Sequence, residues 1–239
     1  MLADESGPDV ASGRLIAGLQ RPRAWIDALI EFIADQLPLW RDRSDRPAAA
    51  SETHLTSQLC AHLNSATRKS AGWDILQFRT EEPDEVRRAR RIDLVPAPRS
   101  EAIWIEGRKY SDFDVLLPIE CKRLPTPAGD RREKREYLVT RASTTGGVQR
   151  FKAGHHGAAH SSAIIIGYIQ RGSVGDWYAR IDRWVCAFVR AGILDWDLND
   201  RLSIMRYDAF LGMGVLQSEH NRPSGLGPIT LRHLWIERV

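Results

Sequence analysis

Leu116-Leu117-Pro118-Ile119-Glu120-Cys121-Lys122-Arg123-Leu124 is the stretch that says most about the fold of this 239-residue chain. It predicts a strand from Asp114 to Arg123 that is apolar until its last residues. Because alternate residues of a strand share a face, Glu120 and Lys122 point one way and Cys121 the other. A carboxylate and an ammonium on one face of an apolar strand are costly to bury without a function. An exposed ion pair of little energetic value would give the same pattern.

A second acid lies 27 residues earlier, in Arg91-Ile92-Asp93-Leu94-Val95, which also predicts an apolar strand. Asp93 could simply be an acid at the end of a strand, since Pro96 follows closely. If the two strands are neighbours, however, Asp93 and Glu120 converge on one divalent cation. Hard oxygen ligands, including the backbone carbonyl of Cys121, suit Mg²⁺ or Mn²⁺. Such an ion lowers the pKa of a bound water, and Lys122 would orient that water or offset charge in the transition state.

The order of the predicted elements indicates an α/β fold with a mixed central β-sheet flanked by helices. The helices are expected over Trp25–Leu37, where Pro38 stops or kinks the chain, from an N-cap at Ser51, over Asp130–Arg141 as a solvated charged helix, and over Asp176–Arg190. The strands are expected over Ile75–Phe78, Arg91–Val95, Ala102–Glu106, Asp114–Arg123, Ala163–Ile169 and Ile229–Val239. We expect residues 1–50 to be a disordered N-terminus plus a helical extension, and residues 51–239 to form one domain.

Composition limits the class of protein. Apolar residues make up 43% of the chain and the formal net charge is only +3, which does not by itself indicate a nucleic-acid partner. The cysteines, Cys60, Cys121 and Cys186, form no CxxC pair and no even set, so a disulfide framework is not expected. No segment reaches the roughly 20 apolar residues of a membrane span. We therefore expect a soluble, cytoplasmic protein.

Asp93 followed by Glu120-Cys121-Lys122 resembles the D…(D/E)xK signature of the PD-(D/E)xK nuclease superfamily, which has the restriction-endonuclease-like fold. The resemblance covers roughly residues 51–170. That fold places its Asp on the second core strand and its ExK on the third, which agrees with the predicted strand order. Ile92 stands where the family name has proline. The long segment between the two motifs implies an added hairpin or strand.

The resemblance also implies two supporting residues. An acid on the helix before the sheet corresponds to Glu52, which equally fits a first-turn glutamate favoured by the helix dipole. A glutamine on the helix after the ExK motif corresponds to Gln149, although this residue follows a break at Gly146 and Gly147.

Basic residues cluster beside both motifs. Arg87, Arg88, Arg90 and Arg91 lead into the Asp93 segment. Those expected to contact a nucleic-acid backbone are Arg123, Arg131, Arg132, Arg150 and Lys152. A solvated helix would give the same pattern, because Glu133 and Glu136 partly offset the charge. His155, His156 and His160 are interpreted as loop histidines able to contact phosphate.

These features together predict an Mg²⁺- or Mn²⁺-dependent endonuclease that cleaves DNA, with RNA or a branched junction as alternative substrates. Fold analogy suggests an effector of a bacterial restriction or anti-phage defence system, working beside an ATPase or helicase partner and able to form an oligomer. Two other classes stay open. One is a catalytically silent subunit that binds nucleic acid or scaffolds a complex. The other is a metal-independent hydrolase that uses Cys121 or the segment His155–His160.

Overall fold

The computed structural model describes residues 24–48, 51–86, 88–105, 107–127, 133–140, 146–193 and 195–238. Its helices are α1 (Ala24–Arg41), α2 (Glu52–Thr67), α3 (Gly147–Lys152), α4 (Val174–Arg190) and a short 3₁₀ helix, η1 (Leu198–Asp200). Its strands are β1 (Leu76–Pro83), β2 (Arg91–Pro98), β3 (Ile103–Ile105), β4 (Arg108–Tyr110), β5 (Ile119–Leu124), β6 (Ser162–Ile169), β7 (Ser203–Asp208), β8 (Met213–His220) and β9 (Ile229–Glu237).

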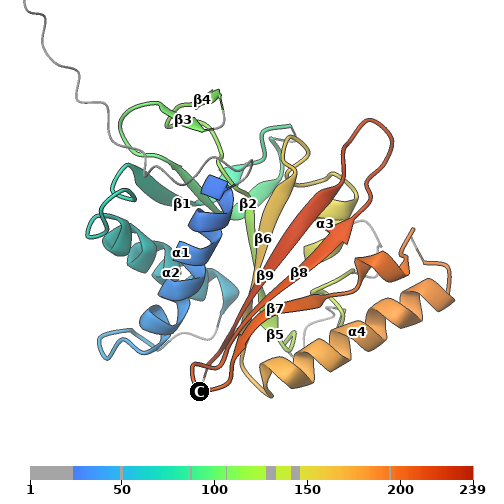
Figure 1. Ribbon diagram of the computed structural model, residues 1–239. Helices are drawn as coiled ribbons and strands as arrows, with labels where there is room; N and C mark the ends of the chain where they lie inside the picture. The colour runs from blue at the N-terminus through green and yellow to red at the C-terminus, as the bar shows by residue number, and fades with distance from the viewer. Residues whose placement is uncertain are drawn as a thin grey trace, which may run out of the picture.

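Seven strands form one mixed sheet in the order β1-β2-β5-β6-β9-β8-β7 (Figure 1). Strands β5, β6 and β9 run parallel to one another, whereas the pairs β1–β2, β2–β5, β7–β8 and β8–β9 are antiparallel. The hairpin β3–β4 is the insertion expected between the two motifs. The predicted fold class, a mixed sheet flanked by helices, is confirmed.

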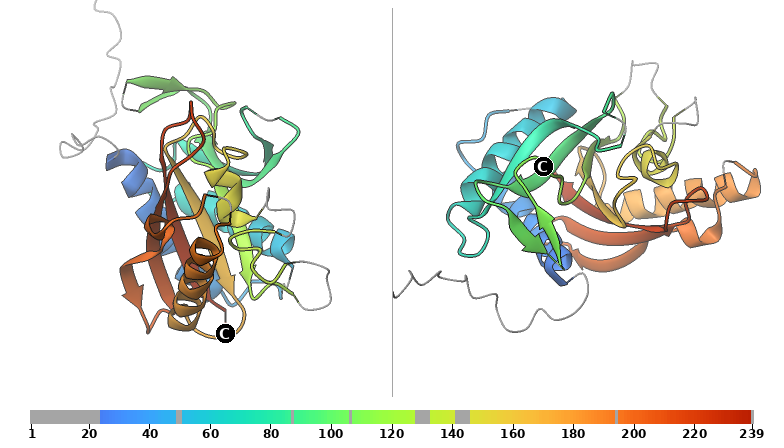
Figure 2. Two further views of the ribbon diagram at one scale, coloured as in Figure 1. Left: turned by 90° about the vertical axis from the view of Figure 1, so that its right-hand side faces the viewer. Right: turned by 90° about the horizontal axis from the view of Figure 1, so that it is seen from above.

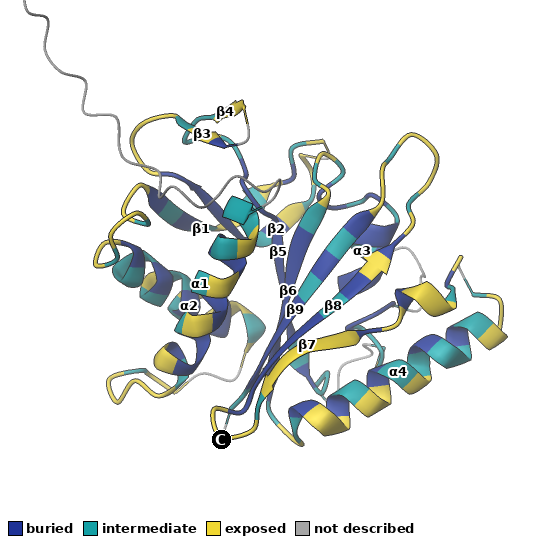
Figure 3. Ribbon diagram, viewed as in Figure 1, coloured by how far each residue is buried: buried dark blue, intermediate teal, exposed yellow. Residues whose placement is uncertain are grey.

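The sheet separates two hydrophobic cores, with α1 and α2 on one face and α4 on the other (Figures 1 and 2). Strand β6 contributes to both cores, because Ile164 and Ile166 face α1 and α2 while Ile165 and Ile169 face α4. Its residues from Ala163 onward are buried (Figure 3), as expected of a strand covered on both faces.

Helix α1 is part of the first core rather than a detached extension. Leu29, Ile33 and Leu37 are fully buried in it. The helix also continues through Pro38 to Arg41, so the proline does not stop it. The expectation of disorder at the N-terminus concerns residues 1–13, which lie outside the described part. Among the described helices, none is both long and apolar enough to cross a membrane.

Two predicted elements differ in the structure. The strand expected from Asp114 begins only at Ile119, because the Asp114 carboxylate closes a turn by accepting hydrogen bonds from the backbone N and Oγ of Ser111, both at 2.7 Å. The solvated helix expected over 130–141 is also wrong where it is described. Residues 134–138 form turns, and Tyr137, Leu138 and Val139 are buried.

The reason for the second difference is a backbone contact. The N–H groups of Gly147 and Val148 donate to the carbonyls of Glu136 and Tyr137, at 2.9 and 3.0 Å. Gly146 has φ 126°, and a Cβ there would lie 2.6 Å from Cα of Val139. The glycine pair therefore lets the start of α3 pass against the buried 137–139 segment.

Candidate active site

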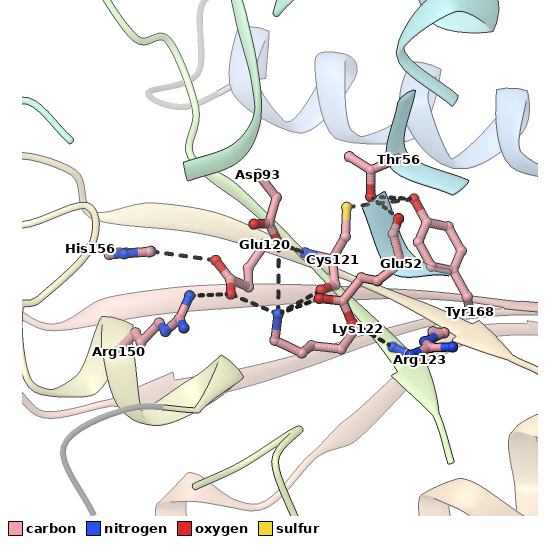
Figure 4. Close-up of polar contacts among 10 residues, drawn as sticks. All are labelled: Glu52, Thr56, Asp93, Glu120, Cys121, Lys122, Arg123, Arg150, His156 and Tyr168. Atoms are coloured by element: carbon pink, nitrogen blue, oxygen red, sulfur yellow. Dashed lines mark hydrogen bonds and ion pairs between the residues drawn. The ribbon is translucent and has the colours of Figure 1, made fainter. Parts of the chain in front are cut away.

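The site forms where strands β2 and β5 separate. Their ladder contains only the pair Leu94–Ile119. Beyond it, carboxylate side chains replace the β2 backbone as acceptors for β5. The backbone N–H of Cys121 donates to Oδ2 of Asp93 at 2.8 Å, and that of Arg123 donates to Oε2 of Glu52 at 3.2 Å (Figure 4). The gap between the strands is thus lined by acids that also satisfy buried backbone donors.

The Lys122 ammonium lies at the centre of this gap (Figure 4). Its Nζ is 2.7 Å from the carbonyl oxygen of Cys121 and 2.8 Å from Oε1 of Glu120. Nζ also lies 3.1 Å from Oε1 of Glu52 and 3.7 Å from Oδ2 of Asp93. The side chain of Lys122 is 6% exposed and that of Glu120 is 0% exposed. Four oxygens from α2, β2 and β5 therefore surround one positive charge.

Helix α2 is held in register with the sheet by its own first turns. Ser51 caps the helix by accepting from the backbone N of His54 at 3.3 Å, so Glu52 is its first residue. One turn later, Thr56 Oγ1 lies 3.4 Å from the hydroxyl of Tyr168, which in turn donates to Sγ of Cys121 at 3.5 Å. This contact between α2, β6 and β5 fixes where the Glu52 carboxylate reaches the gap.

Glu120 has two further neighbours on the side away from Glu52. Nη1 of Arg150 lies 2.6 Å from Oε1 of Glu120. Nδ1 of His156 lies 3.4 Å from Oε2 of Glu120, and neither of these two atoms makes a hydrogen bond of good geometry. His156 lies in a loop, as predicted, and is 2% exposed, so it forms a buried wall of the site.

Burial and charge act in opposite directions on these groups. Burial raises the pKa of Asp93 to about 7, and the nearby Glu120 carboxylate adds to this rise. Burial alone would also raise the pKa of Glu120, but Lys122, His156 and Arg150 together hold it at about 2. Burial alone would lower the pKa of Lys122, yet the carboxylates of Glu120, Asp93 and Glu52 raise it well above its ordinary value. Glu120 and Lys122 are therefore both charged at neutral pH.

Solvent reaches the site through two depressions on either side of Asp93. One, of about 340 Å³, is lined by Glu81, Arg90, Arg91, Asp93, Arg150 and His156. The other, of about 170 Å³, is lined by Glu52, Thr53, Thr56, Ser57, Thr80, Glu81 and Asp93. The first has a basic wall and the second an acidic and hydroxyl-rich one.

The structure brings together Asp93, Glu120, Lys122 and Glu52, with the carbonyl of Cys121, as the sequence predicted. Arg150 also reaches the site, and Arg123 contributes its backbone N–H. Arg131 and Arg132 lie outside the described residues.

Two predicted residues point elsewhere. Gln149 accepts a hydrogen bond from Nε1 of Trp196 at 3.1 Å. Lys152 is 4% exposed and donates to both carboxylate oxygens of Asp200, at 2.8 and 2.7 Å. The assignment of Lys152 as a nucleic-acid contact is therefore wrong, because its ammonium is buried in an ion pair.

The Lys152–Asp200 pair belongs to a buried polar network that the sequence did not reveal. From Asp200 the network continues through His220 at 2.5 Å, and Ser218 then contacts both His220 and His233 at 2.7 and 2.8 Å. It ends at Tyr137, whose hydroxyl lies 2.7 Å from Nδ1 of His233 and accepts from Trp235 at 2.7 Å. The signal for it in the sequence is the presence of Ser218, His220 and His233 in segments that are otherwise largely apolar.

The chemistry of the donor set fits a small divalent cation. Carboxylates of Asp93, Glu120 and Glu52 and the Cys121 carbonyl are all hard oxygen ligands, and they approach one point from three elements. Within the described part of the chain, no group of three or more His, Cys, Asp or Glu residues is arranged as a metal site as it stands. In this arrangement the Lys122 ammonium supplies the positive charge that the carboxylate and carbonyl oxygens surround.

Comparison of the chain with protein-family models, with curated proteins and with solved structures finds no match.

Proposed function

We propose that this protein is a divalent-cation-dependent phosphodiesterase that cleaves nucleic acid, with DNA as the expected substrate, and that its likeness to the PD-(D/E)xK nucleases reflects a shared mechanism. The observation that carries the proposal is the convergence of Glu52, Asp93 and Glu120 on the Lys122 ammonium, at the point where β2 and β5 separate. A stable fold does not require three carboxylates in one half-buried gap.

Asp93, Glu120, Glu52 and the Cys121 carbonyl would hold Mg²⁺ or Mn²⁺ here. When bound, such an ion lowers the pKa of water and offsets negative charge on a phosphate. The basic wall of the larger depression, with Arg91 and Arg150, would bind the phosphodiester backbone.

Lys122 supplies the remaining positive charge. Its ammonium is held in place by four oxygens, so it needs little reorganisation to stabilise charge that develops on the phosphate. His156 and Arg150 keep Glu120 ionised, because both lie against its carboxylate.

The metal-independent alternative has less support. The Cys121 thiol is fully buried on the opposite face, where it contacts Tyr168, and burial raises its pKa far above its usual range. A thiol in that state is a poor nucleophile. The segment His155–His160 places His156 against Glu120 and His160 against Glu85 at 3.1 Å, so neither faces the Cys121 thiol.

The test is cleavage of supercoiled plasmid and of single-stranded DNA and RNA with Mg²⁺, with Mn²⁺, and with chelator alone. We expect metal-dependent cleavage by the wild type and a loss of at least about 100-fold in Glu120→Gln and Lys122→Met, because each variant removes a group that contacts the metal or the phosphate.

Glu31→Gln and Lys69→Met are the matched controls, since both residues are exposed and neither lines the two depressions beside Asp93. They should cleave as the wild type does. Cleavage that persists in Glu120→Gln and Lys122→Met would contradict the assignment of the site. Nucleic-acid binding that is independent of metal, without cleavage, would instead favour the silent scaffold. The roles in anti-phage defence and beside an ATPase or helicase stay predictions.

A further inference from the structure

We infer that Arg150 has two alternative partners: Glu120 in the free protein and a phosphate group of the substrate in the bound protein. Substrate binding would then release a carboxylate oxygen to the divalent cation, so the two ligands bind cooperatively. This inference rests on the proposed function and assigns the larger depression beside Asp93 as the binding site for a phosphodiester.

Arg150 lies between the site and solvent. Its Nη1 is 2.6 Å from Oε1 of Glu120, yet its side chain is 28% exposed whereas that of Glu120 is 0% exposed. The same side chain lines the depression of about 340 Å³, together with Arg90, Arg91 and His156. The guanidinium can therefore turn from the Glu120 carboxylate to an anion in the depression by a side-chain rotation, while Arg150 still lines the depression.

The backbone that carries Arg150 is fixed on both sides. Gln149 is held by Trp196, and Lys152 is held by Asp200 in the buried network. The start of α3 is bound to the 136–138 segment through backbone hydrogen bonds. Because the neighbours of Arg150 are anchored, its exchange between partners is a movement of one side chain.

The contact with Glu120 competes with a metal ion. Oε1 of Glu120 already accepts Nζ of Lys122 at 2.8 Å and Nη1 of Arg150 at 2.6 Å. A divalent cation at the carboxylates is repelled by both of these cations, whichever oxygen of Glu120 it takes, and it can take Oε1 only when Arg150 has left. Arg150 can leave Glu120 with little loss of free energy only when another anion binds its guanidinium. A phosphate suits this exchange, because the planar guanidinium donates two parallel hydrogen bonds to it. By linkage, the metal then strengthens phosphodiester binding by the same factor.

The experiment measures Mn²⁺ affinity by electron paramagnetic resonance, with and without saturating thymidylyl-thymidine phosphorothioate, a slowly cleaved phosphodiester. A titration without protein corrects for Mn²⁺ bound by the dinucleotide. In the wild type we expect the dinucleotide to tighten Mn²⁺ binding at least fivefold, within the usual range of coupling between two sites. In Arg150→Gln we expect tighter Mn²⁺ binding without dinucleotide, and a coupling below about twofold.

Arg201→Gln is the matched control, because the ion pair of Arg201 with Asp182 is also 2.6 Å long, but its arginine side chain is 48% exposed and its carboxylate is not fully buried. It should keep the wild-type coupling. Arg150→Lys retains the charge beside Glu120, so this variant should fold even if Arg150→Gln does not. It should reduce the coupling at least twofold, because an ammonium cannot donate two parallel hydrogen bonds to a phosphate. Thermal unfolding of each variant shows that the comparison is made on folded protein.

The outcomes separate the two proposals. This inference would be overturned if Mn²⁺ and the dinucleotide bound the wild type independently, or if the coupling survived in Arg150→Gln. Either result would leave the nuclease proposal intact. Coupled binding without any cleavage would support the role of Arg150 and count against nuclease activity. An absence of Mn²⁺ binding by the wild type would overturn both.

Discussion

Lys122 balances the negative charge of the site, since its ammonium lies within 3.7 Å of three carboxylates and its side chain is only 6% exposed. Removing one partner of a buried ion pair leaves uncompensated charge, which costs about 3–5 kcal/mol. We therefore predict that Lys122→Met lowers the free energy of unfolding by about that amount, measured in urea with chelator present. Millimolar Mg²⁺ should restore much of the loss, because it replaces the missing positive charge. Stability unaffected by Mg²⁺ would show that the oxygens do not bind a divalent ion.

Asp93 gives a prediction of pH dependence. Its pKa of about 7 in the folded protein lies above the value of about 3.9 in an unfolded chain, so the folded protein retains a proton that the unfolded chain loses. The stability that this group contributes is complete below about pH 4 and is lost as pH rises toward 7, by up to ~4 kcal/mol. Glu120, with its lowered pKa, gives the opposite slope only in the acid range below about pH 5.

We expect Asp93→Asn to lose this decline between pH 4 and 7, measured by urea unfolding without divalent cations. Asp27→Asn, which changes a half-exposed carboxylate on α1, should keep the wild-type slope. An unchanged slope in Asp93→Asn would mean that the carboxylate is ionised across this range.

At the scale of elements, α3 depends on a contact with η1 that lies 48 residues away in sequence. Lys152 and Asp200 are both almost fully buried, and His220 completes the hydrogen bonding of the carboxylate. We predict that Lys152→Met destabilises the protein by about 3–5 kcal/mol, because it leaves a buried carboxylate uncompensated. Arg201→Met, which breaks an exposed pair, should cost less than about 1 kcal/mol. Similar values for the two variants would show that solvent reaches the Lys152–Asp200 pair.

The same elements show what could be predicted from the sequence. Asp93, Glu120 and Lys122 were identified because period-two alternation fixes the face of each residue on a strand, and the N-cap at Ser51 placed Glu52 in a first helical turn. The rotation of α3 about its axis could not be predicted, since the helix begins at a pair of glycines, Gly146 as N-cap and Gly147 as first residue, and is too short for an apolar repeat to show which face is buried. Arg150 therefore reaches the site, whereas the family resemblance favours Gln149. Lys152 looked like a surface cation because its partner, Asp200, is brought close only by the tertiary fold.

At the scale of the whole molecule, the sheet depends on β9, which lies between β6 and β8. Leu234 on β9 is fully buried in the core under α1 and α2. We predict that Leu234→Ala lowers the free energy of unfolding by about 2–5 kcal/mol. Ile204→Ala on the edge strand β7, where the side chain is 47% exposed, should cost less than about 0.5 kcal/mol. Equal losses would indicate that the edge is as well packed as the centre.

The central position of β9 has a consequence for how the protein is made. Strand β5, which carries Glu120 and Lys122, pairs in parallel with β6, and β6 needs residues 229–237 as its second neighbour. Pairings between segments so far apart form late, because the ends of a long loop must first meet. A chain still emerging from the ribosome would therefore lack the second neighbour of β6 until residues 229–237 had been translated. Until that point β6 would be paired on one side only, and the sheet that supports Glu120 and Lys122 would be incomplete on the nascent polypeptide.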